Sequence, residues 1–205
     1  MIGSPISNQG LASIGDLFDY PEESMVERAR GALEESKTWP SEVRHQLEAF
    51  TEAIAELDLG AFQELHSRTF SLAPTCIPYA GVYLFGEGSF KRGNLLAALK
   101  ERFESARFDA GTELADHVGV LLRFAAMLTE AEVDDLREWL LAKPIVAMSG
   151  ALSSSENPYR FLVDAVRLIV APQGVSLEVQ QAVSVHAKSA MLDSCAPSTR
   201  SVSPC

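Results

Sequence analysis

Apolar residues recur at helical spacing along most of the chain, and this periodicity limits the possible folds more than any other feature. After Pro40 and Ser41 they are separated by intervals of four, three, four and three residues, which place them on one helix face: Val43, Leu47, Phe50, Ile54 and Leu57. A sustained two-residue alternation, the pattern of a half-buried strand, is absent. The sequence therefore predicts an all-α fold, with one globular helical bundle.

Local start signals predict where several helices begin. Pro21 is expected in the first turn of a helix that carries Met25, Val26, Ala29 and Leu33. Asp58 is expected to cap a helix that continues to Phe70.

Two further starts lie in the second half of the chain. Thr129 and Glu132 have the spacing of a capping box ahead of Val133. Asn157 and Pro158 mark another start, followed by apolar residues at helical spacing: Leu162, Val166 and Ile169.

One long connection interrupts the helical pattern. Residues 71–80 contain Pro74 and Pro78, which forbid a regular helix, and residues 81–85 then add apolar bulk. A stiff, hydrophobic loop of this kind either lines a binding site or crosses buried between two packed halves. Both interpretations remain open from the sequence.

The chain is expected to form one helical domain, residues 1–187, followed by a tail without fixed structure, residues 188–205. The tail is rich in Ser, Pro and Cys and has no periodicity. No stretch approaches the roughly 18 consecutive apolar residues of a membrane span, and the N-terminus lacks the pattern of a secretory signal. We therefore expect a cytoplasmic protein that does not insert into a membrane.

Negative charge is concentrated near the N-terminus. The formal net charge of the chain is −11, and residues 1–60 contain 12 carboxylates against 4 lysines and arginines. Such a surface repels nucleic acid and attracts cationic peptides over about 10 Å. It also confers solubility, and that simpler interpretation stays open.

The three cysteines, Cys76, Cys195 and Cys205, are too widely spaced for a disulfide framework or a metal knuckle. Only Cys76, in the proline-bounded loop, is expected to touch the fold. The thiols are either inert or serve a redox or regulatory role.

Residues 111–128 combine charged residues with a long apolar face. Thr112 is the expected N-cap of a helix, which puts Glu113 and Asp116 in the first turn, where the helix dipole favours carboxylates. They are either ordinary helix-start carboxylates or the rim of a groove. On a rim, Asp116 accepts two hydrogen bonds from an arginine, with His117 as a neighbouring polar contact.

This segment resembles a known family. Residues 113–118 read Glu-Leu-Ala-Asp-His-Val, followed by Leu121, Leu122 and Phe124, and are similar to the Glu-Leu-Pro-Asp-His-Leu signature of the TorD/DmsD/NarJ chaperones. Ala115 stands where the signature usually has proline. Further elements in the same order are residues 17–21 with Tyr20-Pro21, residues 65–70 leading to Pro74, Pro78, Tyr79 and Tyr83-Leu84, and residues 86–93 with Phe90-Lys91-Arg92-Gly93.

The resemblance implies a non-catalytic chaperone that binds the catalytic subunit of a molybdopterin oxidoreductase. Such proteins hold the client's N-terminal segment, a twin-arginine signal or its vestige, until the molybdopterin guanine dinucleotide is inserted, and bind no cofactor stably themselves. Some members form dimers. The residues that match the client-binding elements are Asp116 and His117, with Glu113, Pro78, Tyr79 and Tyr83 as neighbours.

Two other function classes remain as alternatives. One is a helical scaffold that does not recognise a client signal. The other is a small metal-dependent enzyme, although the four histidines, His45, His66, His117 and His186, are scattered and form no known metal or hydrolase motif.

Overall fold

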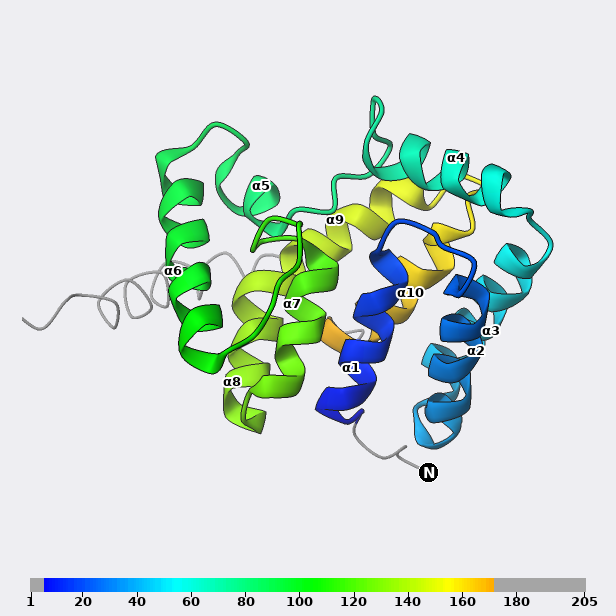
Figure 1. Cartoon of the computed structure of the whole chain (residues 1–205), viewed down its shortest axis with the longest axis horizontal. Helices are drawn as coiled ribbons and strands as arrows, with labels where there is room; N and C mark the ends of the chain where they lie inside the picture. The colour runs from blue at the N-terminus through cyan, green and yellow to red at the C-terminus, as the bar shows by residue number, and fades with distance from the viewer. Residues whose placement is uncertain (1–5, 172–205) are drawn as a thin grey trace, which may run out of the picture. The chain divides into compact units, whose positions relative to one another are not determined.

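The computed structural model describes residues 6–171, and within this range the chain forms helices and no strand. The all-α prediction is therefore confirmed (Figure 1). The α-helices are α1 (Asn8–Gly15), α2 (Met25–Glu35), α3 (Ser41–Ala55), α4 (Leu59–Phe70), α5 (Ala80–Phe85), α6 (Phe90–Ala106), α7 (Val118–Phe124), α8 (Glu130–Asp135), α9 (Ala142–Leu152) and α10 (Tyr159–Val170). The predicted domain boundary at residue 187 and the tail at residues 188–205 lie outside the described residues.

Most of the predicted helix starts are confirmed by the caps that the structure contains. The Asp58 side chain accepts the Ala61 N–H at 2.8 Å at the start of α4. Thr129 and Glu132 form the predicted capping box of α8. At α10, the Asn157 side chain accepts the Tyr159 N–H at 3.0 Å.

The prediction for Pro21 is wrong, because α2 begins only at Met25. Residues 21–24 form a turn in which the Met25 N–H binds the Glu22 carbonyl. The Pro21 carbonyl accepts a hydrogen bond from the Gln63 side chain at 2.9 Å, so this proline ties the N-terminal segment to α4 instead of starting a helix.

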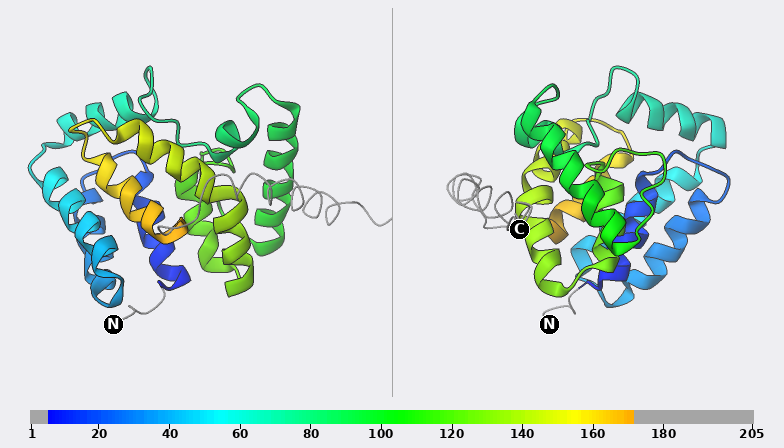
Figure 2. Two further views of the ribbon diagram at one scale, coloured as in Figure 1. Left: turned by 180° about the vertical axis from the view of Figure 1, so that it is seen from behind. Right: turned by 60° about the vertical axis from the view of Figure 1, so that its left-hand side comes forward.

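The buried apolar residues of α1, α3, α7, α9 and α10 belong to one core cluster. Helix α3 packs on α10, α10 packs on α9, and α1 packs on α7; Figure 2 shows α10 between α3 and α9 from behind. Every residue of α7 except Arg123 is buried, which explains the almost entirely apolar sequence of this helix.

Two glycines allow α1 and α7 to cross closely. A Cβ on Gly15 would lie 2.7 Å from the Gly119 carbonyl oxygen, and a Cβ on Gly119 would lie 2.8 Å from the Gly15 carbonyl oxygen. Both contacts are with backbone, which has no room to move away. A side chain at either position would push the two helices apart.

Helices α8 and α9 are joined by a six-residue π-helical segment, Leu136–Leu141. Pro144 follows in the first turn of α9, and its ring nitrogen has no hydrogen to donate to the preceding turn. The wider turns of the π-helix accommodate this missing donor and keep residues 130–152 continuously helical.

Helices α5 and α6 form a hairpin beside α7 and α8 (Figure 1). In α6 only Leu99 and Phe103 are buried; the Phe103 ring packs against Phe108 and Phe124. None of the described helices is long and apolar enough to cross a membrane.

Candidate functional site

Two segments that are far apart in the sequence pair through their backbones at the predicted site. The Ala80 N–H binds the Asp116 carbonyl at 2.8 Å, and the Val118 N–H binds the Pro78 carbonyl at 2.8 Å. Tyr79 and His117 thereby form an isolated antiparallel bridge. The proline loop is therefore a crossing, and its end, which contains Cys76 and Pro78, is buried. This end borders the segment that carries the family signature.

This pairing changes where the signature helix begins. The prediction of Thr112 as N-cap is wrong: α7 starts at Val118, and its N-cap is His117. Residues 111–116 form turns instead, because the carbonyl of Asp116 and the N–H of Val118 bond to the proline loop and not within a helix. Asp116 therefore does not lie in the first turn of a helix.

Asp116 binds an internal arginine. Arg92 Nε lies 2.8 Å from Asp116 Oδ2, and Arg92 Nη2 lies 3.2 Å from Oδ1. The Asp116 side chain is 0% exposed and that of Arg92 is 12% exposed. The expectation that Asp116 stands at a groove rim is wrong. The predicted pair of hydrogen bonds from an arginine is present, but the arginine is Arg92 of this chain, at the start of α6.

Gly81 completes the surroundings of this ion pair. Its N–H donates to Asp116 Oδ2 at 3.2 Å. A Cβ at this position would lie 2.6 Å from the same oxygen and 3.0 Å from Arg92 Cγ. Glycine is therefore required here by the close approach of the α5 backbone to the carboxylate.

Glu113 and Tyr79 form the exposed part of the signature segment. The Tyr79 hydroxyl donates to Glu113 Oε2 at 3.1 Å, and Glu113 is exposed. Burial and the neighbouring Glu113 carboxylate raise the pKa of Tyr79 to about 12, so it stays a hydrogen-bond donor. The Arg92 guanidinium lies 5.6 Å from the centre of the Tyr79 ring and fixes the ring further.

His117 is buried and neutral. Its Nδ1 accepts the Gly119 N–H at 3.2 Å and so caps α7, while the Tyr79 ring packs edge-on at 5.4 Å. Burial lowers the pKa of His117 to about 4, against the opposing effect of the Glu113 and Asp19 carboxylates. Both the cap and the positive end of the helix dipole suit an uncharged ring.

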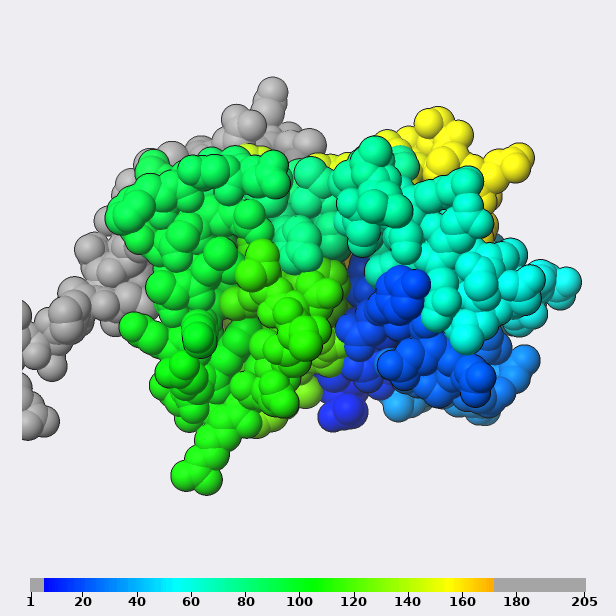
Figure 3. All heavy atoms as spheres, turned by 45° about the horizontal axis from the view of Figure 1, so that its top comes forward, coloured from blue at the N-terminus to red at the C-terminus, as the bar shows by residue number. Residues whose placement is uncertain are grey.

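Tyr79, Glu113 and His117 lie on one face of the molecule. A second histidine, His66 of α4, joins the N-terminal segment to this face. Its Nε2 lies 3.3 Å from the Phe18 carbonyl, and the Tyr20 ring packs edge-on at 5.3 Å. Burial lowers the pKa of His66, and the Glu113 and Asp19 carboxylates are near enough to act against this shift. In Figure 3, the N-terminal segment, α4 and the residues around 110 lie next to one another on one face.

Asp19 anchors the N-terminal side of the face. Its Oδ1 accepts from Arg123 Nη1 at 2.6 Å, and its Oδ2 lies 3.8 Å from Arg28. Arg123 is the one residue of α7 that is not fully buried, so this contact fixes the segment before α2 to the central helix.

Tyr83 and Cys76 hold the proline loop from inside. The Tyr83 hydroxyl accepts the Ile77 N–H at 3.1 Å. Burial raises the pKa of the Cys76 thiol to about 12, which favours the inert interpretation of this cysteine. Cys195 and Cys205 lie outside the described residues.

The structure thus brings all six predicted residues together, in different roles. Glu113 is exposed, Tyr79 and Tyr83 are half-buried, and Pro78, Asp116 and His117 are buried. The sequence interpretation assigned no role to several residues that build this face: Asp19, Tyr20, His66, Gly81 and Arg92. Arg92 belongs to the stretch of residues 86–93 that resembles the family, which was the available signal.

The face carries binding groups and no metal centre. Among the residues that the structure describes, no three His, Cys, Asp or Glu side chains are grouped so that they could hold a metal ion. The arrangement offers an exposed carboxylate, aromatic rings and neutral imidazoles, which are groups suited to hydrogen bonds with cations and to apolar contact.

The sequence model of the family described as nitrate reductase delta subunit matches residues 36–161. The chain belongs to this family. The match confirms the resemblance to the TorD/DmsD/NarJ chaperones and covers Tyr79, Arg92, Asp116 and His117 of the face, whereas Asp19 and Tyr20 lie outside it. No curated protein matches the chain.

Proposed function

We propose that the chain is an assembly chaperone for the catalytic subunit of a nitrate reductase-type molybdenum enzyme. It binds the client's N-terminal segment in the cytoplasm until the molybdopterin guanine dinucleotide has been inserted. The chaperone itself holds no cofactor and performs no chemical step. Membership of the nitrate reductase delta subunit family supports the client class.

The observation that carries the binding role is the exposed Glu113 carboxylate on a face of fixed rings. Tyr79 orients this carboxylate at 3.1 Å, and Leu114 beside it is 48% exposed. The ring of Tyr20, which packs edge-on against His66, is 54% exposed. A client arginine is placed against Glu113, and the apolar part of the client against Leu114 and Tyr20.

Asp116 and His117 take an indirect part in this proposal. Because Arg92 already binds both oxygens of Asp116, a client arginine meets Glu113 first. Asp116 and His117 instead hold the loop that presents Glu113 and Tyr79. They are positioning residues for the client-binding face, as are Pro78 and Tyr83.

A peptide titration tests the proposal. The probe is a synthetic peptide with two adjacent arginines followed by an apolar stretch, labelled for fluorescence anisotropy. Glu113→Gln is expected to weaken binding by about fivefold to tenfold, because a charge-assisted hydrogen bond becomes a neutral one, a difference of about 1 kcal/mol. Tyr20→Ala is expected to weaken it further through lost contact area.

Glu104→Gln on α6 is the matched control, because Glu104 is exposed and the change in net charge is the same. Equal losses for Glu104→Gln and Glu113→Gln would show that only general electrostatics is measured. Absent binding of the wild-type chain would instead favour a helical scaffold without client specificity. A version of the peptide with lysines in place of arginines tests whether bidentate recognition matters.

A further inference from the structure

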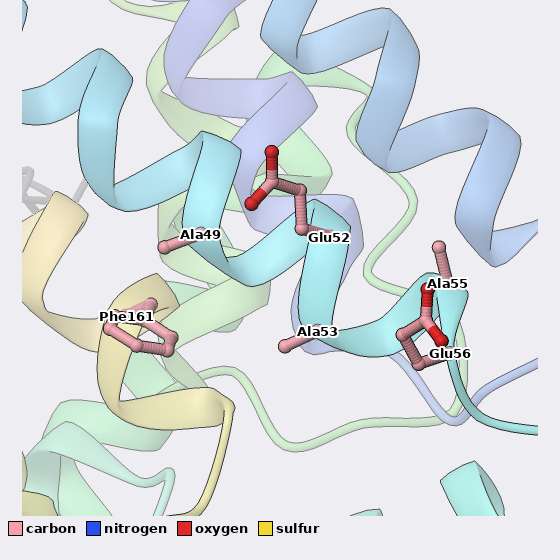
Figure 4. Close-up of a pocket in the computed structure, with 6 residues that line it drawn as sticks. All are labelled: Ala49, Glu52, Ala53, Ala55, Glu56 and Phe161. Carbon is pink, nitrogen blue, oxygen red and sulfur yellow. The ribbon is translucent and has the colours of Figure 1, made fainter.

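An open depression of about 640 Å³ lies between α3 and α10. It is lined by Ala49, Glu52, Ala53, Ala55, Glu56 and Phe161 (Figure 4). None of these residues belongs to the client-binding face.

The floor of the depression is apolar and shallow. Ala49 and Ala53 are half-buried and one helical turn apart, so they leave a smooth strip along α3. The half-buried ring of Phe161 stands on the opposite side, with the Arg160 guanidinium 4.5 Å from the ring centre. Small residues on one side and an aromatic ring on the other fit the apolar side of a helix.

One edge of the depression is a row of like charges. Glu48 and Glu52 of α3 and its C-cap Glu56 follow one another at intervals of four residues, and all three are exposed; Glu52 and Glu56 line the depression. No hydrogen bond or ion pair of these three side chains occurs within residues 6–171, whereas Glu34 binds Lys37 just after α2 and Glu64 binds Arg68 within α4. Carboxylates at i and i+4 destabilise a helix, so the row adds a repulsion to the last two turns of α3.

The guanidinium of Arg160, beside Phe161, is not paired with this row. Arg160 is held on the Phe161 side, where its Nη1 donates to the Ser155 carbonyl at 3.0 Å. The depression therefore has an acidic edge on α3 and an aromatic edge on α10. This asymmetry is complementary to a helix with lysines or arginines along one side and leucine-like residues along the next.

We propose that the depression between α3 and α10 docks a basic amphipathic helix of a partner protein. The partner's apolar side chains cover Ala49, Ala53 and Phe161, and its cations bind the carboxylates of the Glu48, Glu52 and Glu56 row. This surface is independent of the client-binding face, so each can fail its test without the other.

The first test uses a labelled synthetic Leu/Lys amphipathic helical peptide and the full chain at physiological salt. Replacing Glu52 and Glu56 together by Gln is expected to raise the Kd about fivefold to tenfold, as for two exposed ion pairs. The control replaces Glu101 and Glu104 of α6 by Gln, which changes the net charge equally and is expected to alter the Kd less than about twofold. Equal losses in both double variants would overturn the proposal.

Ala53→Arg tests the apolar floor. Arginine is a good helix former, so α3 is expected to persist, while the long cationic side chain fills the depression and repels the peptide. Hydrogen exchange with bound peptide is expected to show protection along residues 45–57 of the wild type and none in Ala53→Arg. Unchanged binding by Ala53→Arg at an unchanged unfolding temperature would overturn the proposal. So would a dimer that Ala53→Arg dissociates, because a second copy of the chain would then be the occupant.

Discussion

Arg92 binds both carboxylate oxygens of Asp116, with Nε 2.8 Å from Oδ2 and Nη2 3.2 Å from Oδ1. The pair joins the first turn of α6 to the segment that leads into α7. Asp116 also receives the Gly81 N–H, so α5, α6 and the signature segment meet at one side chain. The residue that the family resemblance places in signal recognition is thus part of the internal structure of the site.

Asp116→Ala is expected to lower the free energy of unfolding by about 2–4 kcal/mol, because it leaves Arg92 and the Gly81 N–H without their acceptor. Urea unfolding measures it, in a cycle with Arg92→Ala and the double variant. Additive losses in the cycle would contradict the direct pairing.

Gly81→Ala is expected to destabilise the chain by about 1–3 kcal/mol, since the added methyl group overlaps Asp116 and Arg92. Gly93→Ala is the control. It lies one residue after Arg92 in α6, where a Cβ meets nothing within 4 Å, so the change is expected to be neutral or stabilising. Chemical unfolding compares the two, and similar effects of both substitutions would argue against the close approach at Gly81.

His117 is expected to make stability depend on pH. Because folding lowers its pKa from 6.5 to about 4, the folded state resists protonation, and stability falls as the pH drops from 6.5 towards 4. The loss between pH 7 and pH 5 is on the order of 2 kcal/mol. His117→Asn keeps a capping side chain and removes the titration, so its unfolding midpoint is expected to vary less over this range. An identical pH dependence in both proteins would exclude His117 as the cause.

Cys76 is expected to resist modification in the folded protein, because its thiol is buried and burial raises its pKa to about 12. The measurement is the reaction with Ellman's reagent in a Cys195→Ser, Cys205→Ser background at pH 8. Labelling is expected to follow the unfolding transition in urea. Rapid stoichiometric labelling without urea would restore a redox role for Cys76.

The helices could be predicted where their signals are local. The starts of α3, α4, α8 and α10 depend on a cap or a proline within a few residues of an apolar face, and sequence periodicity finds these. Pro21 gave the same local signal, but its carbonyl contacts Gln63 of α4, a partner 42 positions away. The misplaced start of α7 has a similar cause, since the backbone of Asp116 pairs with the proline loop.

The chemistry of the candidate site could be predicted better than its geometry. A carboxylate that binds an arginine was expected at Asp116, and the structure contains that pair. The identity of the arginine could not be predicted, because Arg92 lies 24 residues away and no spacing rule links the two positions. His66 gave no clearer signal, since an isolated histidine on an apolar helix does not identify its neighbours.

The bridge between Tyr79 and His117 also defines how the α5–α6 hairpin joins the rest of the chain. The bridge places residues 79 and 117 side by side, so the two ends of residues 80–116 lie close together. Residues 80–116 therefore begin and end at nearly the same point of the helical bundle. The loops within this segment can therefore change in length between related proteins with little entropic cost and without moving α7, while α5 stays packed on α9 and α6 on α7.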